Sequence, residues 1–208
     1  IPIKESATRY MFKGFPQGIS ERQQLDFHSP YGCSKGAADK YVRDYARIYG
    51  IPTVVFRQSC IYGPNQFGVE DQGWLAWFAI ASLFKKPVAV YGNGKQVRDV
   101  LHVNDLVTLY ERAIDRIKKA RGEAFNVGGG SGNTYSLVEF FDVLKTTHNL
   151  PLSIRGAPIR PGDQKVFISD NTKTRTYLGW EPKVGIKEGV MSLVDWVRTN
   201  RETIARLY

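Results

Sequence analysis

Hydrophobic and polar positions change their spacing along the chain in a way that separates helices from strands. Apolar residues recur at helical spacing over residues 31–49, and Ser29-Pro30 offers an N-cap followed by proline at the first helical position. Gly50 is a typical residue to end that helix. The run 53–56 is short, apolar and β-branched, which is typical of a buried strand. The pattern therefore predicts a helix over 31–49 and then a strand.

Helical and strand patterns continue to alternate downstream, which indicates an α/β fold with at least part of a parallel sheet. Residues 1–28 and 151–162 carry no clear period and are predicted to be mostly loop. The remaining predicted elements are a buried helix over 74–84, strands over 88–91 and 95–101 joined as a hairpin at 92–94, a helix over 105–117, a strand over 124–127, a helix opened by the capping box 136–139, and a last helix over 186–207.

Composition argues against several classes of function, but it does not identify the function. The 208 residues hold 29 basic and 20 acidic side chains, a net charge of +9, yet the basic residues are scattered, which argues against a nucleic-acid partner. Two cysteines cannot build a disulfide framework and suit a reducing cytoplasm, and three histidines lie too far apart for a histidine-built metal site. No apolar run reaches 18 residues, so no membrane partner is expected.

Tyr31 and Lys35 are the first pair that suggests chemistry. Four residues apart on a helix, the two side chains share one face. A phenol has a pKa of about 10, so making it a base near neutrality requires roughly 4 kcal/mol. A nearby ammonium and the helix N-terminus both favour the phenolate. The pair could then move a proton to or from a sugar hydroxyl, although Tyr-x-x-x-Lys also occurs by chance in many proteins.

The order of four further motifs gives this pair a context. They occupy residues 57–64, 92–105, 126–130 and 160–163. In this order and spacing the chain resembles the C-terminal part of the extended short-chain dehydrogenase/reductases, namely the sugar-nucleotide epimerases and dehydratases. The resemblance implies the C-terminal part of a Rossmann-like doubly wound parallel sheet plus a smaller α/β substrate domain. It also implies that residues 1–70 belong to the NAD-binding domain and 71–208 mainly to the substrate domain, with 95–130 returning to the former.

The resemblance also assigns residues to the catalytic and cofactor sites. Tyr31 matches the family's catalytic acid/base. Lys35 matches the lysine that holds the nicotinamide ribose and favours the phenolate, so both residues are expected to touch NAD. Arg57, Gln58 and Ser59 match the strand-to-turn segment that borders the nicotinamide.

Substrate contacts are implied further along the chain. Arg98 and Arg160 look like the family's clamp on the substrate diphosphate, and a guanidinium fork suits that task. Asp163 belongs to the motif that carries Arg160. Gln66 and Gln72 are further candidate substrate contacts.

Neighbouring polar residues are expected to be structural. Asp99, His102 and Asp105 share a string with Arg98, and we expect them to hold that strand and the helix after it. Cys60 stands where many family members carry Asn, which questions a phosphate contact there and favours a buried, inert thiol.

Residues 31–41 and 66–78 resemble one branch of the family, the CDP-paratose (CDP-tyvelose) 2-epimerases. This similarity implies an NAD-dependent epimerase acting on a nucleotide-diphospho-sugar, a CDP-hexose in that branch. Trp74 and Trp77 could pack near the base, although an apolar helix favours a core position. Two alternatives stay open: a sugar-nucleotide 4,6-dehydratase, and a non-catalytic nucleotide-sugar or RNA binder on the same fold.

A dinucleotide site needs a Gly-rich turn between a strand and a helix, and no such turn precedes Tyr31. The run Gly128–Gly130 follows a predicted strand but comes too late. The chain also begins with Ile1, so we expect a piece of a longer enzyme that is inactive alone. Family members usually dimerise through the Tyr–Lys helix, which predicts a homodimer or homotetramer. The choice between NAD and NADP stays open.

Overall fold

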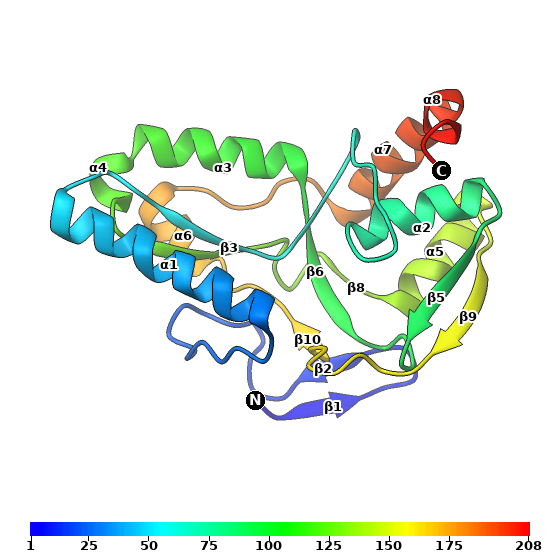
Figure 1. Ribbon diagram of the computed structural model, residues 1–208, viewed down its shortest axis with the longest axis horizontal. Helices are drawn as coiled ribbons and strands as arrows, with labels where there is room; N and C mark the ends of the chain where they lie inside the picture. Colours follow the sequence, from blue (N-terminus) through cyan, green and yellow to red (C-terminus); the bar gives the residue numbers. More distant parts are fainter.

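The computed structural model describes residues 1–208 and arranges them as an α/β protein (Figure 1). The strands are β1 (Ile3–Glu5), β2 (Tyr10–Phe12), β3 (Val55–Gln58), β4 (Cys60–Tyr62), β5 (Pro87–Tyr91), β6 (Val97–His102), β7 (Ala124–Val127), β8 (Thr134–Ser136), β9 (Ser153–Ala157) and β10 (Val166–Phe167). The helices are α1 (Pro30–Tyr49), α2 (Trp74–Leu83), α3 (Val103–Asp115), α4 (Ile117–Ala120), α5 (Leu137–His148), α6 (Thr172–Leu178), α7 (Ile186–Thr199) and α8 (Arg201–Ala205).

Strand β6 is the centre of the sheet structure. It pairs in parallel with β4 and β10 and antiparallel with β8. Two further parallel pairs, β3 with β7 and β5 with β9, complete the α/β part of the fold, and β1 with β2 forms a separate antiparallel hairpin. The predicted α/β class with parallel pairing is therefore confirmed.

Ser59 connects two of these strand pairs. It lies between β3, which pairs with β7, and β4, which pairs with β6. Its backbone N–H donates to the Val127 carbonyl at 2.8 Å, and its hydroxyl donates to the Asp99 carbonyl at 2.7 Å. One residue thus ties the end of β3 to both neighbouring strands.

Helix α1 forms where the sequence predicts it. The Ser29 hydroxyl accepts a hydrogen bond from the Gly32 N–H at 3.0 Å, and Gly50 ends the helix with φ 69°. An ion pair inside the fold holds the helix on its sheet: Nε of Arg57 on β3 lies 2.6 Å from Oδ2 of Asp39, and both side chains are largely buried. The orientation of α1 relative to β3 therefore depends on this pair.

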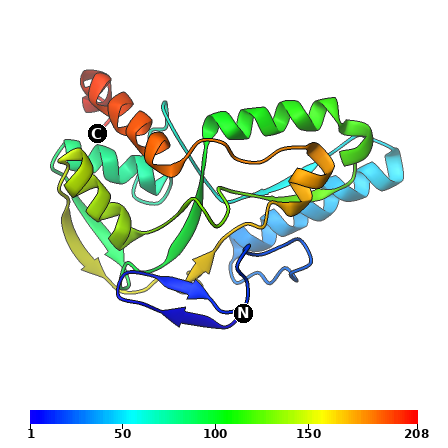
Figure 2. The ribbon, with the colours of Figure 1, turned by 180° about the vertical axis from the view of Figure 1, so that it is seen from behind.

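Two separate apolar cores support the molecule. The larger has 18 buried residues and lies among α2, α5, α7 and the strands beside them, at the right of Figure 1. The smaller has nine and lies between α3, β7 and α6. Figure 2 shows the same two groups of helices from behind, with β6 running between them.

The hairpin predicted at 92–94 is wrong, although both of its strands exist. β5 pairs with β9, and β6 pairs with β4, β8 and β10, so the two strands never pair with each other. The physical reason is burial: five of the six residues of β6 are buried, as in a central strand with neighbours on both sides. The turn residues 92–94 give no information about these partner strands, which lie far away in the chain.

Further differences from the predicted elements concern short segments, and β4, β8, β10 and α4 were also not predicted. Residues 1–28 contain the β1–β2 hairpin, which is anchored by an ion pair between Arg9 and Glu139 of α5. The segment 151–162 contains β9, and α6 was not predicted. The last helix divides at Asn200 into α7 and α8. β9 lacks a local signal because its partner, β5, lies far away in the chain. β1 and β2 pair with each other, but contacts from residues far along the chain, such as Glu139, hold this hairpin on the fold.

The glycine run after β7 packs against the protein's own interior. A Cβ at Gly128 would lie 2.0 Å from Asp99 Oδ2, and one at Gly129 would lie 2.1 Å from the Val100 carbonyl oxygen. The same Asp99 oxygen accepts hydrogen bonds from the N–H groups of Gly130 and Ser169. Burial raises the pKa of this carboxyl, and the bonds it accepts oppose that rise. Asp99 therefore has the expected structural role.

His102 and Asp105 are also structural, as expected. His102 Nδ1 accepts from the Asn104 N–H at the start of α3, at 3.3 Å. Asp105 Oδ2 accepts from the backbone N–H groups of Lys183 and Val184. His102 thus holds the junction of β6 and α3, and Asp105 ties the start of α3 to the segment before α7.

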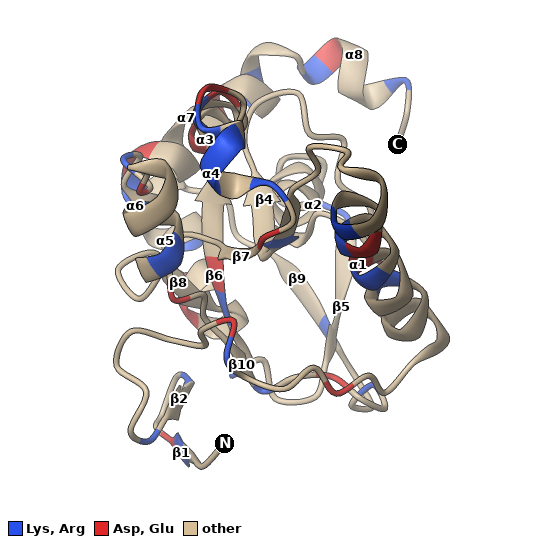
Figure 3. Cartoon of the chain, turned by 90° about the vertical axis from the view of Figure 1, so that its left-hand side faces the viewer, with Lys and Arg blue, Asp and Glu red and all other residues tan.

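Basic and acidic residues are mixed along the helices. Figure 3 shows Lys and Arg interleaved with Asp and Glu on the helices. None of the helices combines the length and the apolar character that crossing a bilayer requires.

We expect Asp39→Ala to lower the free energy of unfolding by about 3 kcal/mol, because it leaves the Arg57 guanidinium buried without its partner. Asp44→Ala in the same helix breaks an exposed pair with Arg47 and should cost less than about 1 kcal/mol. Urea unfolding followed by circular dichroism measures both values. Equal costs for the two variants would contradict a special role for the Asp39–Arg57 pair.

Gly129→Ala should destabilise the fold by at least about 2 kcal/mol, because the new methyl group meets the backbone of β6. Gly132→Ala is the matched control, since nothing lies within 4 Å of its added Cβ, and it should be neutral or slightly stabilising. Thermal unfolding of both variants is the measurement. A Gly129→Ala variant as stable as the parent would show that this turn can move away from β6.

Candidate active site

The Tyr31–Lys35 pair lies at the open N-terminal end of α1. The Tyr31 side chain is 72% exposed, and Lys35 Nζ lies 5.5 Å from the centre of its ring. The Ser34 hydroxyl bonds to the Tyr31 carbonyl and does not compete for the phenol. The two groups thus share one helix face one turn apart, with the phenol free to meet a ligand.

The three residues expected to border the nicotinamide have different surroundings. Arg57 faces Asp39 of α1 in the ion pair described above, so its observed partner is a carboxylate inside the fold. The Gln58 side chain is exposed and donates to the Tyr110 hydroxyl at 2.6 Å. Ser59 is half-buried and is engaged by its neighbouring strands. Of the three, Gln58 has the most accessible side chain, and the cofactor roles of all three stay predictions.

Four of the five residues predicted to contact substrate line one cavity of about 200 Å³. They are Gln72, Arg98, Arg160 and Asp163, and they come from three separate parts of the chain. Trp74 and Phe78 of α2 supply an apolar wall. A cavity that joins two guanidinium groups to an apolar wall suits a ligand with a phosphate group and an apolar ring.

Arg98 is held at the wall of this cavity by its own neighbours. Its guanidinium donates to Asp163 Oδ1 at 2.9 Å and to the carbonyls of Val97 and Gln164. The side chain is 20% exposed. A positioned, partly sheltered guanidinium of this kind can present its remaining N–H groups to an anion at small cost in conformational freedom.

Arg160 lies at the mouth of the cavity in a ring of four side chains. Its guanidinium carbon is 3.7 Å from the centre of the Tyr91 ring, and its Nη2 donates to Asp71 Oδ1 at 2.7 Å. The Tyr91 hydroxyl donates in turn to Glu70 Oε1 at 3.1 Å. Glu70 and Asp71 therefore face the two side chains that stack at the cavity mouth.

The loop that carries Arg160 also touches the approach to the catalytic helix. A Cβ added to Gly162 would lie 3.6 Å from Cβ of His28, which is three residues before Tyr31. The loop of Arg160 and the start of α1 are thus neighbours in space. This contact connects the two halves of the predicted site.

Gln66 and Cys60 lie outside the set that lines the cavity. The Gln66 amide donates to the Ile61 carbonyl at 3.0 Å, so its observed contact is to the backbone. Cys60 accepts a hydrogen bond from the Trp74 indole at 3.2 Å, and burial raises the pKa of its thiol. Cys60 is thus a half-buried thiol, less enclosed than expected, whose raised pKa disfavours the reactive thiolate, and it orients a cavity-lining tryptophan.

Trp74 and Trp77 differ in their surroundings. Trp74 packs against Phe78 and Phe140 and also lines the cavity. Trp77 stacks on Tyr208, away from the cavity-lining set. The expected core position is therefore observed for both, and only Trp74 also reaches the candidate site.

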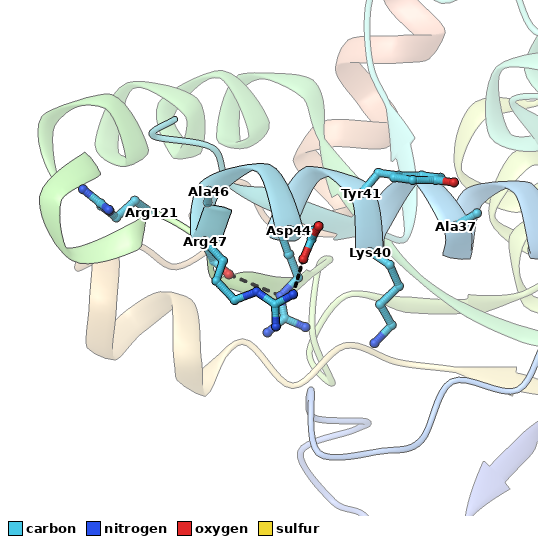
Figure 4. Close-up of a pocket in the computed structure, with 9 residues that line it drawn as sticks. Ala37, Lys40, Tyr41, Asp44, Ala46, Arg47 and Arg121 are labelled. Carbon is cyan, nitrogen blue, oxygen red and sulfur yellow. Dashed lines mark hydrogen bonds and ion pairs between the residues drawn. The ribbon is translucent and has the colours of Figure 1, made fainter. Parts of the chain in front are cut away.

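A larger hollow of about 830 Å³ lies along α1 but is a poor candidate for the chemistry. Figure 4 shows Lys40, Arg47 and Arg121 around it, with Asp44 bonded to Arg47. None of the ten predicted site residues lines it. We therefore place the reaction site at the smaller cavity and at the start of α1.

Sequence reasoning missed the cavity residues Glu70, Asp71 and Tyr91. Each had a partial signal: the two carboxylates adjoin Gln72, and Tyr91 ends an apolar strand immediately before Gly92. Their proximity depends on tertiary packing of the 70–73 turn against β5, which no local pattern reports.

The described residues fit an NAD site in part. Tyr31, Lys35 and Gln58 are accessible side chains at one side of the fold, as a nicotinamide riboside would require. The glycine run 128–130 is filled by Asp99 and Val100, so it offers no cradle for a pyrophosphate. The prediction that this run is not the dinucleotide turn is supported by that packing.

Known proteins resemble this chain in both sequence and fold. The profile of the family described as GDP-mannose 4,6 dehydratase matches residues 13–193. CDP-paratose 2-epimerase of Salmonella typhi is 49% identical over 197 residues, which cover 92% of this chain and 58% of that protein. UDP-glucose 4-epimerase of Thermotoga maritima, solved with UDP-glucose, has a TM-score of 0.75 at 33% identity, covering 85% of this chain and 55% of that one.

A third relative was solved with a cofactor. UDP-glucuronic acid 4-epimerase of Bacillus cereus, in complex with UDP-glucuronic acid and NAD, has a TM-score of 0.77 at 25% identity, covering 92% of this chain and 57% of that one. The chain thus spans little more than half the length of these relatives. It belongs to the GDP-mannose 4,6-dehydratase family, the sugar-nucleotide epimerases and dehydratases of the extended short-chain dehydrogenase/reductases.

Proposed function

We propose that this chain provides the catalytic helix and the substrate-binding part of an NAD-dependent epimerase that inverts C2 of a CDP-hexose, as in the interconversion of CDP-paratose and CDP-tyvelose. The single observation that carries this proposal is the cavity that gathers Gln72, Arg98, Arg160 and Asp163 beside the loop next to Tyr31. The similarity to CDP-paratose 2-epimerase over 92% of the chain supports the choice of sugar nucleotide.

Proton transfer is the task of Tyr31. Its exposed phenol removes the proton from the sugar hydroxyl at C2 and returns it after the carbon has been inverted, while Lys35 favours the phenolate. When bound, NAD supplies reversible hydride chemistry at the same carbon. The sugar gains and loses the same atoms, so the product is an isomer of the substrate.

Arg98 and Arg160 hold the diphosphate during this cycle. The ketone must present its other face before reduction, so the sugar has to rotate while the rest of the ligand stays fixed. Two guanidinium groups at the cavity fit that requirement, because each can bind phosphate oxygens in a bidentate way. In this role Asp163 positions Arg98 through their 2.9 Å bond.

Two alternative functions can be distinguished from the epimerase. A sugar-nucleotide 4,6-dehydratase would use the same clamp but would eliminate water, and a dTDP-glucose 4,6-dehydratase of Escherichia coli is 32% identical over 201 residues. A non-catalytic binder of nucleotide sugars or RNA would not need Tyr31 and Lys35 together. The observation against the binder is the exposed phenol one turn from an ammonium.

We propose further that residues 1–70 belong to the NAD-binding domain and residues 71–208 mainly to the substrate domain, with residues 95–130 returning to the NAD-binding domain.

The free thiols of Cys33 and Cys60 suit a cytoplasmic protein. We infer a homodimer or homotetramer, supported by the exposed apolar and aromatic face of α1 at Tyr41, Tyr45 and Ile48.

Tyr31→Phe should lower kcat for CDP-paratose by about 100-fold to 10,000-fold, because the phenol that moves the proton is lost. CDP binding should change less than twofold, since the clamp is intact. The measurements are turnover and CDP titration in the protein at its natural length. Tyr41→Phe, on the same helix and also exposed, is the control and should keep full activity. Wild-type-like turnover by Tyr31→Phe would contradict the assigned role.

Turnover in D2O separates the two reactions when CDP-paratose and dTDP-glucose are both offered, because only dTDP-glucose keeps the C6 hydroxyl that a 4,6-dehydratase eliminates. The epimerase returns the same hydrogen to C2, so the product should have the substrate's mass and carry no deuterium on carbon. A dehydratase product would lose 18 mass units and gain solvent deuterium on carbon. Mass spectrometry and proton NMR of the product decide between them, and loss of water would overturn the epimerase proposal.

Arg98→Gln should weaken CDP binding by roughly 10-fold to 100-fold and cytidine binding by less than threefold, because only CDP offers phosphates to the guanidinium. Arg175→Gln, which removes a charge from an exposed pair on α6, is the control. Equal losses for CDP and cytidine would show that Arg98 only supports the shape of the cavity. Calorimetric titration of both ligands makes the distinction.

A further inference from the structure

The turn that precedes α2 presents two carboxylates at the mouth of the substrate cavity. Val69 and Gln72 exchange backbone hydrogen bonds of 2.8 and 3.0 Å, which leaves Glu70 and Asp71 at the tip of a two-residue turn. Its base is rigid, because a Cβ at Gly68 would lie 2.4 Å from the backbone N of Trp77. The position of the tip is therefore fixed by packing against α2.

The two carboxylates at the tip have different partners. Glu70 accepts from the Tyr91 hydroxyl and so fixes the edge of that ring. Asp71 binds the guanidinium of Arg160, and its own side chain is 81% exposed. Once Arg160 moves, the carboxylate of Asp71 is therefore more available to a ligand than that of Glu70.

Arg160 donates to Asp71 through Nη2, so a diphosphate that is bound through the same nitrogen takes the place of Asp71. A diphosphate carries more charge than one carboxylate, so it competes successfully for a guanidinium that is 43% exposed. Binding of the phosphates then frees Asp71 and uncovers the face of Tyr91 on which Arg160 stacks. The exchange leaves an aromatic surface with an unpaired carboxylate beside it.

This pair of features suits one kind of nucleobase. An aromatic ring stacks on any base and does not choose among them. A carboxylate accepts hydrogen bonds only, and cytosine carries an amino donor at the position where uracil and thymine carry a carbonyl oxygen. At that position Asp71 would therefore bind the amino group of cytosine and repel the carbonyl oxygen of uracil or thymine.

We propose that Asp71 is the residue that selects cytosine, by accepting a hydrogen bond from its amino group once the diphosphate has taken Arg160. The inference rests on the proposed function, because it concerns the base of the same CDP-sugar. Glu70 acts as a positioning residue that holds the Tyr91 ring.

The test compares CDP, UDP and dTDP binding by calorimetry in the parent protein at its natural length and in Asp71→Asn. The parent should bind CDP at least tenfold more tightly than UDP or dTDP. Asp71→Asn should lower that preference by about tenfold or more, because an amide can turn either its carbonyl or its amino group toward the base. UDP binding should stay equal or become tighter, since Arg160 loses a competing carboxylate.

Glu111→Gln is the matched control, because it removes one exposed negative charge away from the cavity, and it should leave the CDP to UDP ratio unchanged. If Asp71→Asn changes the affinity for CDP and UDP by the same factor, Asp71 does not read the base and the inference is overturned.

A different set of results would overturn the proposed function. If the parent protein binds no nucleoside diphosphate, or binds UDP as tightly as CDP, the assignment of a CDP-sugar is wrong whatever the variant does. A parent that prefers CDP with an unchanged preference in Asp71→Asn keeps the proposed function and removes only the role of Asp71.

Discussion

The buried carboxylate of Asp99 is the constraint on which both parts of the site depend. It accepts hydrogen bonds from two backbone N–H groups, of Gly130 and Ser169, and thereby fixes β6 against the turn after β7 and the segment after β10. Residues alternate sides along a strand, so a fixed Asp99 directs its neighbour Arg98 toward the cavity. The Asp99 carbonyl also accepts from Ser59, which links the end of β3 to the same strand. The carboxylate and the backbone carbonyl of Asp99 together thus connect β6 to the end of β3, to the turn after β7 and to the segment after β10.

The two guanidinium groups of the site are each paired with a carboxylate. In the proposed function, a bound ligand replaces these partners, so neither guanidinium group is left unpaired. Arg98 is paired with Asp163 and Arg160 with Asp71 before any phosphate arrives. Such pairing holds the guanidinium groups near their working positions, and an exposed pair such as Arg160–Asp71 costs little to break. In the clamp that we propose, the more sheltered Arg98 is the fixed point and the more exposed Arg160 is the part that moves.

Much of the local structure was predictable because its causes are local. Ser29, Pro30 and Gly50 define α1 through capping, and the capping box of Ser136 and Glu139 starts α5 as predicted. The hairpin at 92–94 failed because turn residues report a change of direction but not which strands pair. The cavity was predictable only in part: Arg98, Arg160, Gln72 and Asp163 belong to recognisable motifs, whereas Tyr91 and Asp71 meet only through tertiary packing. Arg57 shows the converse, since its motif suggests a ligand contact while its observed partner is Asp39.

A crystal structure of the protein with CDP and NAD is the most direct test of the central claim, that the cavity at β6 and the start of α1 form one active site. The account predicts the diphosphate within hydrogen-bonding distance of Arg98 and Arg160, with Arg160 separated from Asp71 and the Tyr31 hydroxyl directed at the sugar-binding space. A diphosphate bound instead in the hollow beside Lys40, Arg47 and Arg121, with the Arg160–Asp71 pair intact, would contradict it.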